Sequence, residues 1–332
     1  MDDFKPRELA ITVWSFAKYG TDETPHFFDM QRSDRAFNYP EEFDNLFAAA
    51  EEAALVSQLS DFNAQDLSNT AWGFTTAMRP ATELFAAIAY KAVREHMVSH
   101  FSSQHLSNIA WAFAMACVRA DDLFDAIKDV LLETDLSKFD TQSLASLSWS
   151  FAVADVYDPV LHPKLVNRIA SYLRDEQSQT DNVMSQFHLW MLWMTTERKL
   201  PLPPLVCAPA RRLAPTLLQT SRLQREIFAE LGSLFSGFVE EFTEPTTGYV
   251  VDLALPSACV AIEVDGPKHY LSRGDGHYLP TGNTLLKRRL VKAAKWHLIV
   301  ITWLEWSIAK GRLAHHSLLR MKLASVGLIS PE

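Results

Sequence analysis

Cysteine, glycine and long apolar stretches are scarce in this chain of 332 residues. The three cysteines (Cys117, Cys207 and Cys259) are too few and too widely spaced for a disulfide framework or a zinc knuckle, so a reducing compartment is the default. With 11 glycines and 16 prolines, the chain is neither collagenous nor of low complexity. No apolar run approaches the ~20 residues that a membrane-spanning helix requires, which excludes an integral membrane protein.

A targeting pattern is also missing from the N-terminus. The opening residues, MDDFKPRELA, contain neither a basic segment followed by an apolar one nor an acid-poor stretch rich in Arg and Ser. We expect either that the chain has no targeting signal or that it is a mature or shortened form. What is present is 48% hydrophobic and 21% charged residues, which is ample for the cores of about two domains.

Charge is distributed unevenly along the chain. Residues 1–220 contain 18 basic and 29 acidic side chains, a net −11, whereas residues 221–332 contain 13 and 11, a net +2. Within the second part, residues 267–332 hold 11 basic side chains against three acidic ones. This local excess indicates either a phosphate-binding surface or a solvated helix face.

A repeat of about 38 residues fills the first 200 positions. Close variants of the pattern L-x-x-x-A-W-x-F occur at 9–16, 67–74, 106–113 and 144–151, and a degenerate fifth copy lies at 184–194. The four tryptophans are separated by 58, 39 and 38 residues. The first interval therefore carries about 20 extra residues, which we place in a loop at 22–42.

Each copy predicts an amphipathic helix. Counted from the leucine as position 0, positions 0, 3, 4 and 7 share one side of a 3.6-residue period and form an apolar stripe. The tryptophan at position 5 flanks that stripe, and its expected role is core packing. Ser68, Asn69, Ser107 and Asn108 are expected to face away from the stripe. They either line a concave ligand-reading surface or support the first helical turn.

A second helix follows the tryptophan in two copies, within ATELFAAIAYKAVREH and ADDLFDAIKDVLLE. One helix pair cannot bury its apolar face alone, whereas stacked pairs make a continuous core. The predicted fold of residues 1–199 is therefore an α-solenoid of helix pairs.

The chain changes character after the repeats. Five prolines within 200–215 prevent a long regular helix, so we predict a linker at 200–220 and a second domain at 221–332. In that domain we expect, in order, a helix (221–235), a hairpin of two strands (249–255 and 258–266), a loop (266–282), a helix (282–296), a strand (297–303) and a closing helix (305–323). This order is typical of a small α/β domain, which makes the chain multidomain, α followed by α/β.

Acidic residues interrupt the predicted hairpin. Asp252 lies in its first strand, and Glu263 and Asp265 are two residues apart in its second strand, so the latter two project from one face. Three carboxylates near the ends of adjacent strands predict a Mg²⁺ or Mn²⁺ site capable of phosphodiester hydrolysis. The alternative is that these acids pair with Lys or Arg, or cap the following loop.

Three further residues fit the hydrolytic interpretation. His269 lies close enough in sequence to position or deprotonate a water molecule, and Lys268 or Lys287 would stabilise a phosphate group.

The stretches VDLALPSACVAIEVDGPKHY (251–270) and GNTLLKRRLVKAAKWHLIVITWLEW (282–306) resemble the RAP domain, named for RNA-binding proteins abundant in apicomplexans. The resemblance covers roughly residues 222–324. It is specific, because several motifs occur in order at compatible spacing. The upstream copies resemble octotricopeptide-type helical repeats. Together these resemblances imply a mitochondrial or chloroplast factor that acts in RNA processing, stability, translation or ribosome assembly.

RAP domains are also similar to restriction-endonuclease-like folds of the PD-(D/E)XK class. That similarity implies functional roles for Asp252, Glu263, Asp265 and His269, with Glu226 on the preceding helix as a weaker candidate. The standard motif supplies a lysine in an acid-x-Lys element, whereas Glu263-Val264-Asp265 has an aspartate in that place. The departure argues against catalysis.

Three functions follow from these observations. The leading one is an RNA-binding protein without a required cofactor, whose repeats contact single-stranded organellar mRNA or rRNA while the C-terminal domain engages the phosphate backbone. The predicted RNA-binding residues are Ser68, Asn69, Ser107, Asn108, Lys268, Lys287, Arg288, Lys292 and Lys295.

The acidic array weakens simple electrostatic capture of RNA. It favours a second function, in which the array binds ribosomal or other proteins within a particle such as a mitochondrial ribosome. The third function is a metal-dependent endoribonuclease. The RNA-binding and scaffold functions, by contrast, predict no enzymatic activity.

Overall fold

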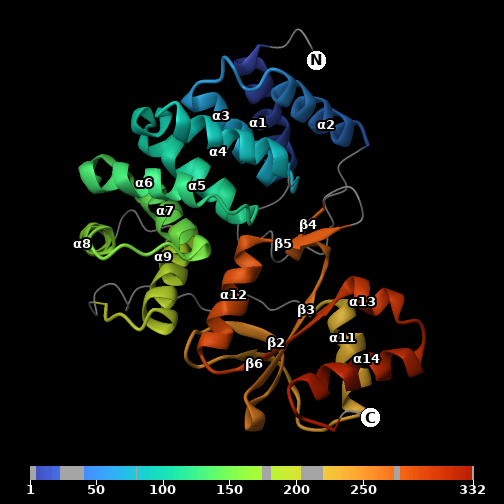
Figure 1. The fold of residues 1–332 in the computed structure, drawn as a ribbon. Coiled ribbons are helices and arrows are strands. Elements are labelled where there is room, and N and C mark those ends of the chain that lie inside the picture. Colours follow the sequence, from blue (N-terminus) through green and yellow to red (C-terminus); the bar gives the residue numbers. More distant parts are fainter. Residues whose placement is uncertain are drawn as a thin grey trace.

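The computed structural model describes residues 5–22, 41–79, 81–173, 181–202, 220–272 and 277–330. An array of helices lies above a smaller domain built on a β-sheet (Figure 1). The predicted fold class, α-helical repeats followed by a small α/β domain, is therefore confirmed. Residues 23–40 of the predicted loop and most of the predicted linker lie outside the described residues, while residues 22, 41 and 42 belong to helices. Among the helices of the described ranges, none is long and apolar enough to cross a membrane.

The array consists of helix pairs. In chain order its helices are α1 (Pro6–Asp22), α2 (Glu41–Val56), α3 (Ala64–Thr76), α4 (Thr82–Arg94), α5 (Ser103–Met115), α6 (Asp121–Glu133), α7 (Thr141–Ala154), α8 (Leu161–Tyr172) and α9 (Asp181–Leu192). A π-helical segment, Trp193–Glu197, continues α9. The odd-numbered helices, which carry the repeated pattern, pack side by side in an inner layer, and the even-numbered helices form an outer layer.

Capping residues fix where the inner helices start. Asn63, Ser102 and Asp140 precede α3, α5 and α7, and each side chain accepts a hydrogen bond from a main-chain N–H of the first turn. Each cap lies four residues before the leucine of its repeat. The repeated pattern therefore begins at the same point of each helix, which keeps the copies in register.

The repeated aromatic residues join neighbouring copies. The ring centroids of Trp14 and Trp72 lie 6.2 Å apart, and those of Trp72 and Trp111 lie 6.4 Å apart. The tryptophans of the first three copies thus bridge neighbouring repeats. Their burial differs along the array: the first three are half-buried, whereas Trp149 of the fourth copy is completely buried.

The second domain surrounds a four-stranded sheet with strand order β1-β2-β3-β6. Its elements are α11 (Arg222–Gly232), β1 (Val239–Thr243), β2 (Val250–Leu255), β3 (Val260–Asp265), β4 (Tyr270–Ser272), β5 (Tyr278–Pro280), α12 (Gly282–Ala293), β6 (His297–Thr302), α13 (Trp303–Ile308) and α14 (Arg312–Ser325). β2 is antiparallel to both β1 and β3, whereas β6 is parallel to β3. α11 and α14 share one core with the sheet, and α12 lies on its other side (Figure 1).

Three features of this domain differ from the prediction. The closing helix is broken into α13 and α14 at Gly311, whose φ of 86° is unfavourable for residues with a side chain. Strand β1 was not predicted, because its sequence, VEEFT, has acids where an apolar residue would mark a strand. The expected loop at 266–282 contains the short antiparallel pair β4 and β5.

Candidate functional site

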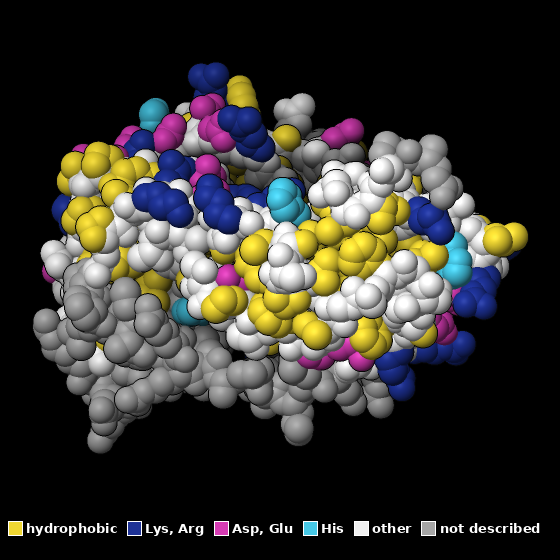
Figure 2. All heavy atoms as spheres, turned by 90° about the horizontal axis from the view of Figure 1, so that it is seen from below, with side chains coloured by type: hydrophobic (Ala, Val, Ile, Leu, Met, Phe, Trp, Pro, Cys, Tyr) yellow, Lys and Arg dark blue, Asp and Glu magenta, His cyan; other side chains and the backbone are white. Residues whose placement is uncertain are grey.

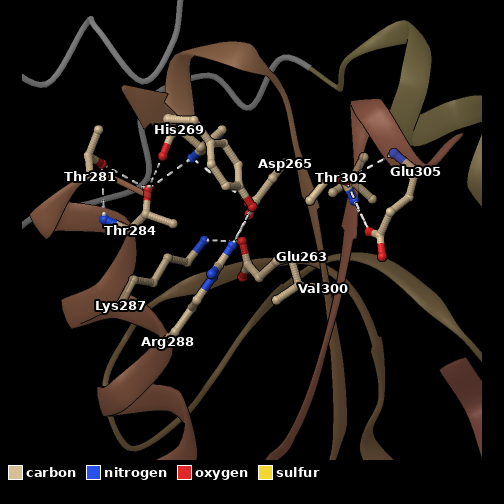
Figure 3. Close-up of polar contacts among 12 residues, drawn as sticks. Glu263, Asp265, His269, Thr281, Thr284, Lys287, Arg288, Val300, Thr302 and Glu305 are labelled. Carbon is tan, nitrogen blue, oxygen red and sulfur yellow. Dashed lines mark hydrogen bonds and ion pairs between the residues drawn. The ribbon is translucent and has the colours of Figure 1, made fainter. Parts of the chain in front are cut away.

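The predicted carboxylates lie on β2 (Asp252) and β3 (Glu263 and Asp265). Figure 3 shows Glu263 and Asp265 beside α12. Glu263 and Asp265 are 4% and 2% exposed, although both belong to a strand otherwise made of apolar residues. Two cations on α12, Lys287 and Arg288, extend toward them (Figure 3). The interpretation that these acids pair with Lys or Arg is thus confirmed.

Glu263 is bound by one of these cations. The ammonium Nζ of Lys287 donates to Glu263 Oε2 at 2.7 Å, while Glu263 Oε1 is buried and has no partner among the described residues. Burial raises the pKa of Glu263 to about 8, against the opposing effect of Lys287. Burial by itself would lower the pKa of Lys287, but the nearby Glu263 and Asp252 carboxylates raise it.

Asp265 belongs to a second group of contacts. Arg288 binds Asp265 Oδ2, and the hydroxyl of Tyr270 donates to the same oxygen at 3.0 Å. Arg288 also donates to the Tyr270 oxygen at 2.8 Å, which closes a three-membered network. His269 Nδ1 lies 3.9 Å from Asp265 Oδ1, and burial lowers the pKa of this histidine to about 4. The imidazole is therefore neutral at physiological pH.

Asp252 completes the acidic group from the neighbouring strand. Its Oδ2 accepts a 2.6 Å hydrogen bond from the main-chain N–H of Val264. Burial raises its pKa to about 6, although Lys287 and this hydrogen bond both act in the opposite direction.

The arrangement does not fit the predicted metal site of Asp252, Glu263 and Asp265. Throughout the described ranges, no three His, Cys, Asp or Glu side chains are grouped so that they could hold a metal ion. Lys287 and Arg288 take the positions from which a cation would neutralise the carboxylates. Glu226, the weaker candidate, instead pairs with Arg222 on an exposed part of α11.

The predicted RNA-binding cations fall into two groups. Lys287 and Arg288 are directed into the domain and bind carboxylates, and their contact with RNA stays a prediction. Lys292 and Lys295, one and two turns further along the chain, are exposed. Neither of these two lysines has a carboxylate partner within the described part of the chain. The remaining predicted cation, Lys268, is half-buried.

The predicted polar residues of the array also divide into two groups. Ser68 and Ser107 are 0% and 4% exposed, so the expectation that they face away from the core is wrong. Each hydroxyl donates to a main-chain carbonyl three residues earlier, which satisfies it inside the inner layer. Asn69 and Asn108 are half-buried and lie at the surface as expected.

A contact between the two parts of the chain was not predicted. Arg289 of α12 donates to the carbonyl oxygens of Ala152 and Val153 at 3.1 and 2.8 Å, and it forms ion pairs with Asp155 and Glu197. Successive helical residues point about 100° apart, so Lys287, Arg288 and Arg289 reach three different environments. This spacing is the signal that could have separated them.

The start of α12 touches the array even more closely. A Cβ on Gly282 would lie 2.2 Å from the carbonyl oxygen of Ala114, at the end of α5. Leu286 and Leu290 belong to the same buried core as the helices of the array. His188 Nε2 and the carbonyl oxygen of Thr247, 3.2 Å apart, join α9 to the second domain. The second domain is therefore docked on the later repeats.

The family model of the RAP domain matches residues 262–322, which run from β3 into α14 and include the carboxylates of β3 and all of α12. The chain carries a RAP domain. It is also 37% identical over 101 residues to the "RAP domain-containing protein, chloroplastic" of Oryza sativa subsp. japonica. That alignment covers 30% of this chain and 15% of the length of the rice protein.

The buried network can now be placed within the RAP domain. The matched segment contains Glu263 and Asp265 together with both cations that neutralise them. What the network does is join α12 to the sheet, because charges on the strand would otherwise be buried without counterions. The helix thus fixed carries Arg289 and Gly282 against the array, so the network also positions the docking surface.

Proposed function

We propose that the protein is an organellar RNA-associated factor that binds single-stranded RNA, with the RAP domain holding the phosphate backbone. The observation that carries this proposal is the matched RAP domain together with Lys292 and Lys295 at the end of its docked helix, two exposed cations that pair with no carboxylate of the described residues. Neutralising phosphates requires cations that are not already bound to carboxylates. The repeats would contribute contacts to bases.

The face on which the RAP domain lies supports this assignment. Figure 2 shows groups of Lys and Arg side chains beside a central hydrophobic area. The sequence of this domain has an excess of basic residues in 267–332, 11 against three, despite the net −9 of the whole chain. Such a local field attracts polyanions independently of net charge.

The organellar part of the proposal rests on the rice relative, whose name describes it as chloroplastic. By this relationship we propose a site of action in a chloroplast or mitochondrion, in RNA processing, stability, translation or ribosome assembly. A fluorescent fusion of the full-length protein, imaged with markers of both organelles, tests the location. Cytosolic fluorescence would contradict it.

Salt-dependent binding tests the RNA contact. We compare wild type with Lys292→Glu/Lys295→Glu, using labelled single-stranded RNA and fluorescence anisotropy at several salt concentrations. Each phosphate contact contributes about 0.7 to the slope of log K against log salt, so the variant is expected to bind more weakly with a slope shallower by about 1.4. The matched control, Lys138→Glu/Lys199→Glu, makes the same charge change on exposed residues of the array.

An equal loss in both variants would indicate a general charge effect and contradict the assignment to the RAP domain. A denaturing gel of the same samples, with Mn²⁺ or EDTA, tests the nuclease alternative. Metal-dependent cleavage that Asp265→Ala abolishes would favour it. Failure of the wild type to bind any RNA would favour a protein-interaction scaffold.

A further inference from the structure

Two adjacent repeats present the same three side chains on one face of their inner helices. In the second copy these are Gln65, Asn69 and Trp72, and in the third Gln104, Asn108 and Trp111. The spacing i, i+4, i+7 aligns each set along a single face of α3 or α5. We call these six residues the amide strip.

The amide strip is accessible. Gln65 and Gln104 are exposed, and Asn69, Asn108 and the two tryptophans are half-buried. Within the described ranges, the four side-chain amides make no hydrogen bond to another group of the protein. Trp72 and Trp111 contact each other with a centroid separation of 6.4 Å, which makes a continuous aromatic surface beside the amides.

The fourth repeat provides an internal comparison. Its corresponding residues are Gln142, Ser146 and Trp149. Gln142 donates to Ser146 at 3.1 Å and to Gln186 of α9 at 3.2 Å, so its amide is used within the protein. Trp149 is completely buried in the helix on which α12 docks through Arg289. The amide strip therefore ends where the RAP domain begins.

The first repeat differs in another way. It places Arg7, Ile11 and Trp14 at the corresponding positions, and Lys18 lies 5.1 Å from the Trp14 ring centroid. This copy offers cations in place of amides. Its residues suit a phosphate group but do not repeat the set of the next two copies.

The inner helices carry few of the acids that make the array negative. α5 contains no Asp or Glu, and α3 contains only Asp66, which is 3% exposed and caps its own helix. The acids lie on the outer layer, where α2 and α6 each carry five. The net charge of residues 1–220 consequently does not describe the surface of the amide strip.

We propose that the amide strip receives the bases of single-stranded RNA, one base at the second repeat and one at the third. A carboxamide places a donor and an acceptor side by side, which matches the paired donor and acceptor on a base edge, and an indole ring supplies a stacking surface. Helical repeats read one base each through two or three side chains. This inference rests on the proposed function and names its base-reading residues.

Identical side chains predict identical preferences. Because both repeats present Gln, Asn and Trp at the same positions, the preferred target contains the same base at two successive reading positions. A homopolymer therefore satisfies both repeats at once, and one homopolymer should bind better than the others.

The test uses labelled oligoadenylate, oligocytidylate and oligouridylate of about eight nucleotides, a length within the range of single-strand binding sites. Full-length wild type is expected to prefer one of the three. Asn69→Ala/Asn108→Ala is expected to lose about tenfold or more in affinity for that RNA and to lose the preference for it. The reason is that each substitution deletes an amide that makes a pair of contacts to a base. The salt dependence should stay unchanged, since no charge is removed.

Two controls isolate the amide strip. Gln142→Ala changes the same helix position in the fourth repeat, and Tyr90→Ala removes a 67% exposed aromatic side chain from the outer helix α4. Both are expected to bind RNA like the wild type. Gln65→Ala/Gln104→Ala provides a second test at exposed positions, where folding is unaffected.

The outcomes separate the two proposals. If wild type binds RNA without a homopolymer preference, or if both double variants bind like wild type, the amide strip does not read bases, while the proposed RNA function stands. An unchanged RNA affinity would also be the result if this face bound an extended peptide. If wild type binds none of the RNAs, the proposed function itself is contradicted.

Discussion

The guanidinium of Arg289 donates a 2.8 Å hydrogen bond to the main-chain carbonyl of Val153, and thereby joins the RAP domain to the end of a repeat helix. The last carbonyls of an α-helix have no partner within that helix. A cation at this position satisfies them and also interacts favourably with the negative end of the helix dipole. The two parts of the chain are thus linked by hydrogen bonds to the C-terminal carbonyls of a repeat helix as well as by apolar packing.

Removal of this cation should loosen the contact. We expect Arg289→Ala to lower the free energy of unfolding by about 2 kcal/mol, because charged hydrogen bonds and two carboxylate partners are lost together. Urea denaturation measures the change. Arg119→Ala is the control: that side chain is 87% exposed, and its ion-pair partner among the described residues is the exposed Asp121, so its loss should leave stability nearly unchanged. Equal effects would contradict the docking role.

Gly282 should tolerate no side chain. Because a Cβ there would lie 2.2 Å from the Ala114 carbonyl oxygen, Gly282→Ala must displace α12 from α5. We expect a loss of about 1–3 kcal/mol in a thermal or urea unfolding experiment, the usual cost of overpacking. Gly232→Ala has no atom within 4 Å of the added Cβ and should leave stability nearly unchanged. A neutral Gly282→Ala would show that the two domains are not held in this contact.

The buried pair of Glu263 and Lys287 predicts a rescue. Lys287→Met leaves the Glu263 carboxyl without its cation and should cost about 3–5 kcal/mol while that carboxyl is ionised. The cost should shrink as the pH falls, because burial raises the pKa of Glu263 and the loss of Lys287, which opposes that rise, raises it further, so that the carboxyl becomes protonated. Adding Glu263→Gln removes the uncompensated charge and should recover most of the loss. Lys128→Met, which breaks an ion pair with an exposed Asp125 carboxylate, serves as the control.

His162 predicts a pH dependence for the array. This side chain is completely buried beside Trp190, with the ring centroids 6.2 Å apart, and burial lowers its pKa from 6.5 to about 4. The unfolded chain therefore binds a proton more readily, so stability should fall as the pH decreases from 6.5 to 4. The expected contribution of this group is about 2–3 kcal/mol.

His162→Phe isolates that contribution. The phenyl ring keeps the aromatic contacts but cannot take up a proton. As the pH falls from 6.5 to 4, the wild type should therefore lose more unfolding free energy than the variant does. Chemical denaturation at several pH values measures it. His269, whose pKa is also lowered, is present in both proteins and cancels in the difference. A difference that does not vary with pH would contradict the assignment.

Much of the fold could be predicted from local patterns. The 38-residue repeat identified the inner helices, because burial of a leucine, a small residue and a phenylalanine on one face requires a helical period. Alternation and β-rich composition located β2, β3 and β6 to within about two residues. The degenerate fifth repeat at 184–194 is also helical, formed by α9 and the start of the π-helical segment that continues it.

The candidate site was predictable only in part. That Glu263 and Asp265 share a face follows from the two-residue period of a strand, and the structure shows both buried together. Which cations neutralise these carboxylates does not follow from the sequence. Lys287 and Arg288 come from a helix more than 20 residues away, and the rotation of that helix on the sheet depends on the packing of all its faces. The basic run therefore looked like a single RNA-binding surface.

The sequence by itself determined the repeat, the order of the elements and the type of each half of the chain, since these depend on short-range periodicity and composition. Only the tertiary structure decided which repeated residues remain accessible. Ser68 is buried because a neighbouring inner helix lies against each side of α3, and Trp149 is buried in the repeat on which α12 docks. Equivalent positions of a repeat acquire different environments from their neighbours, and those neighbours are distant in the sequence.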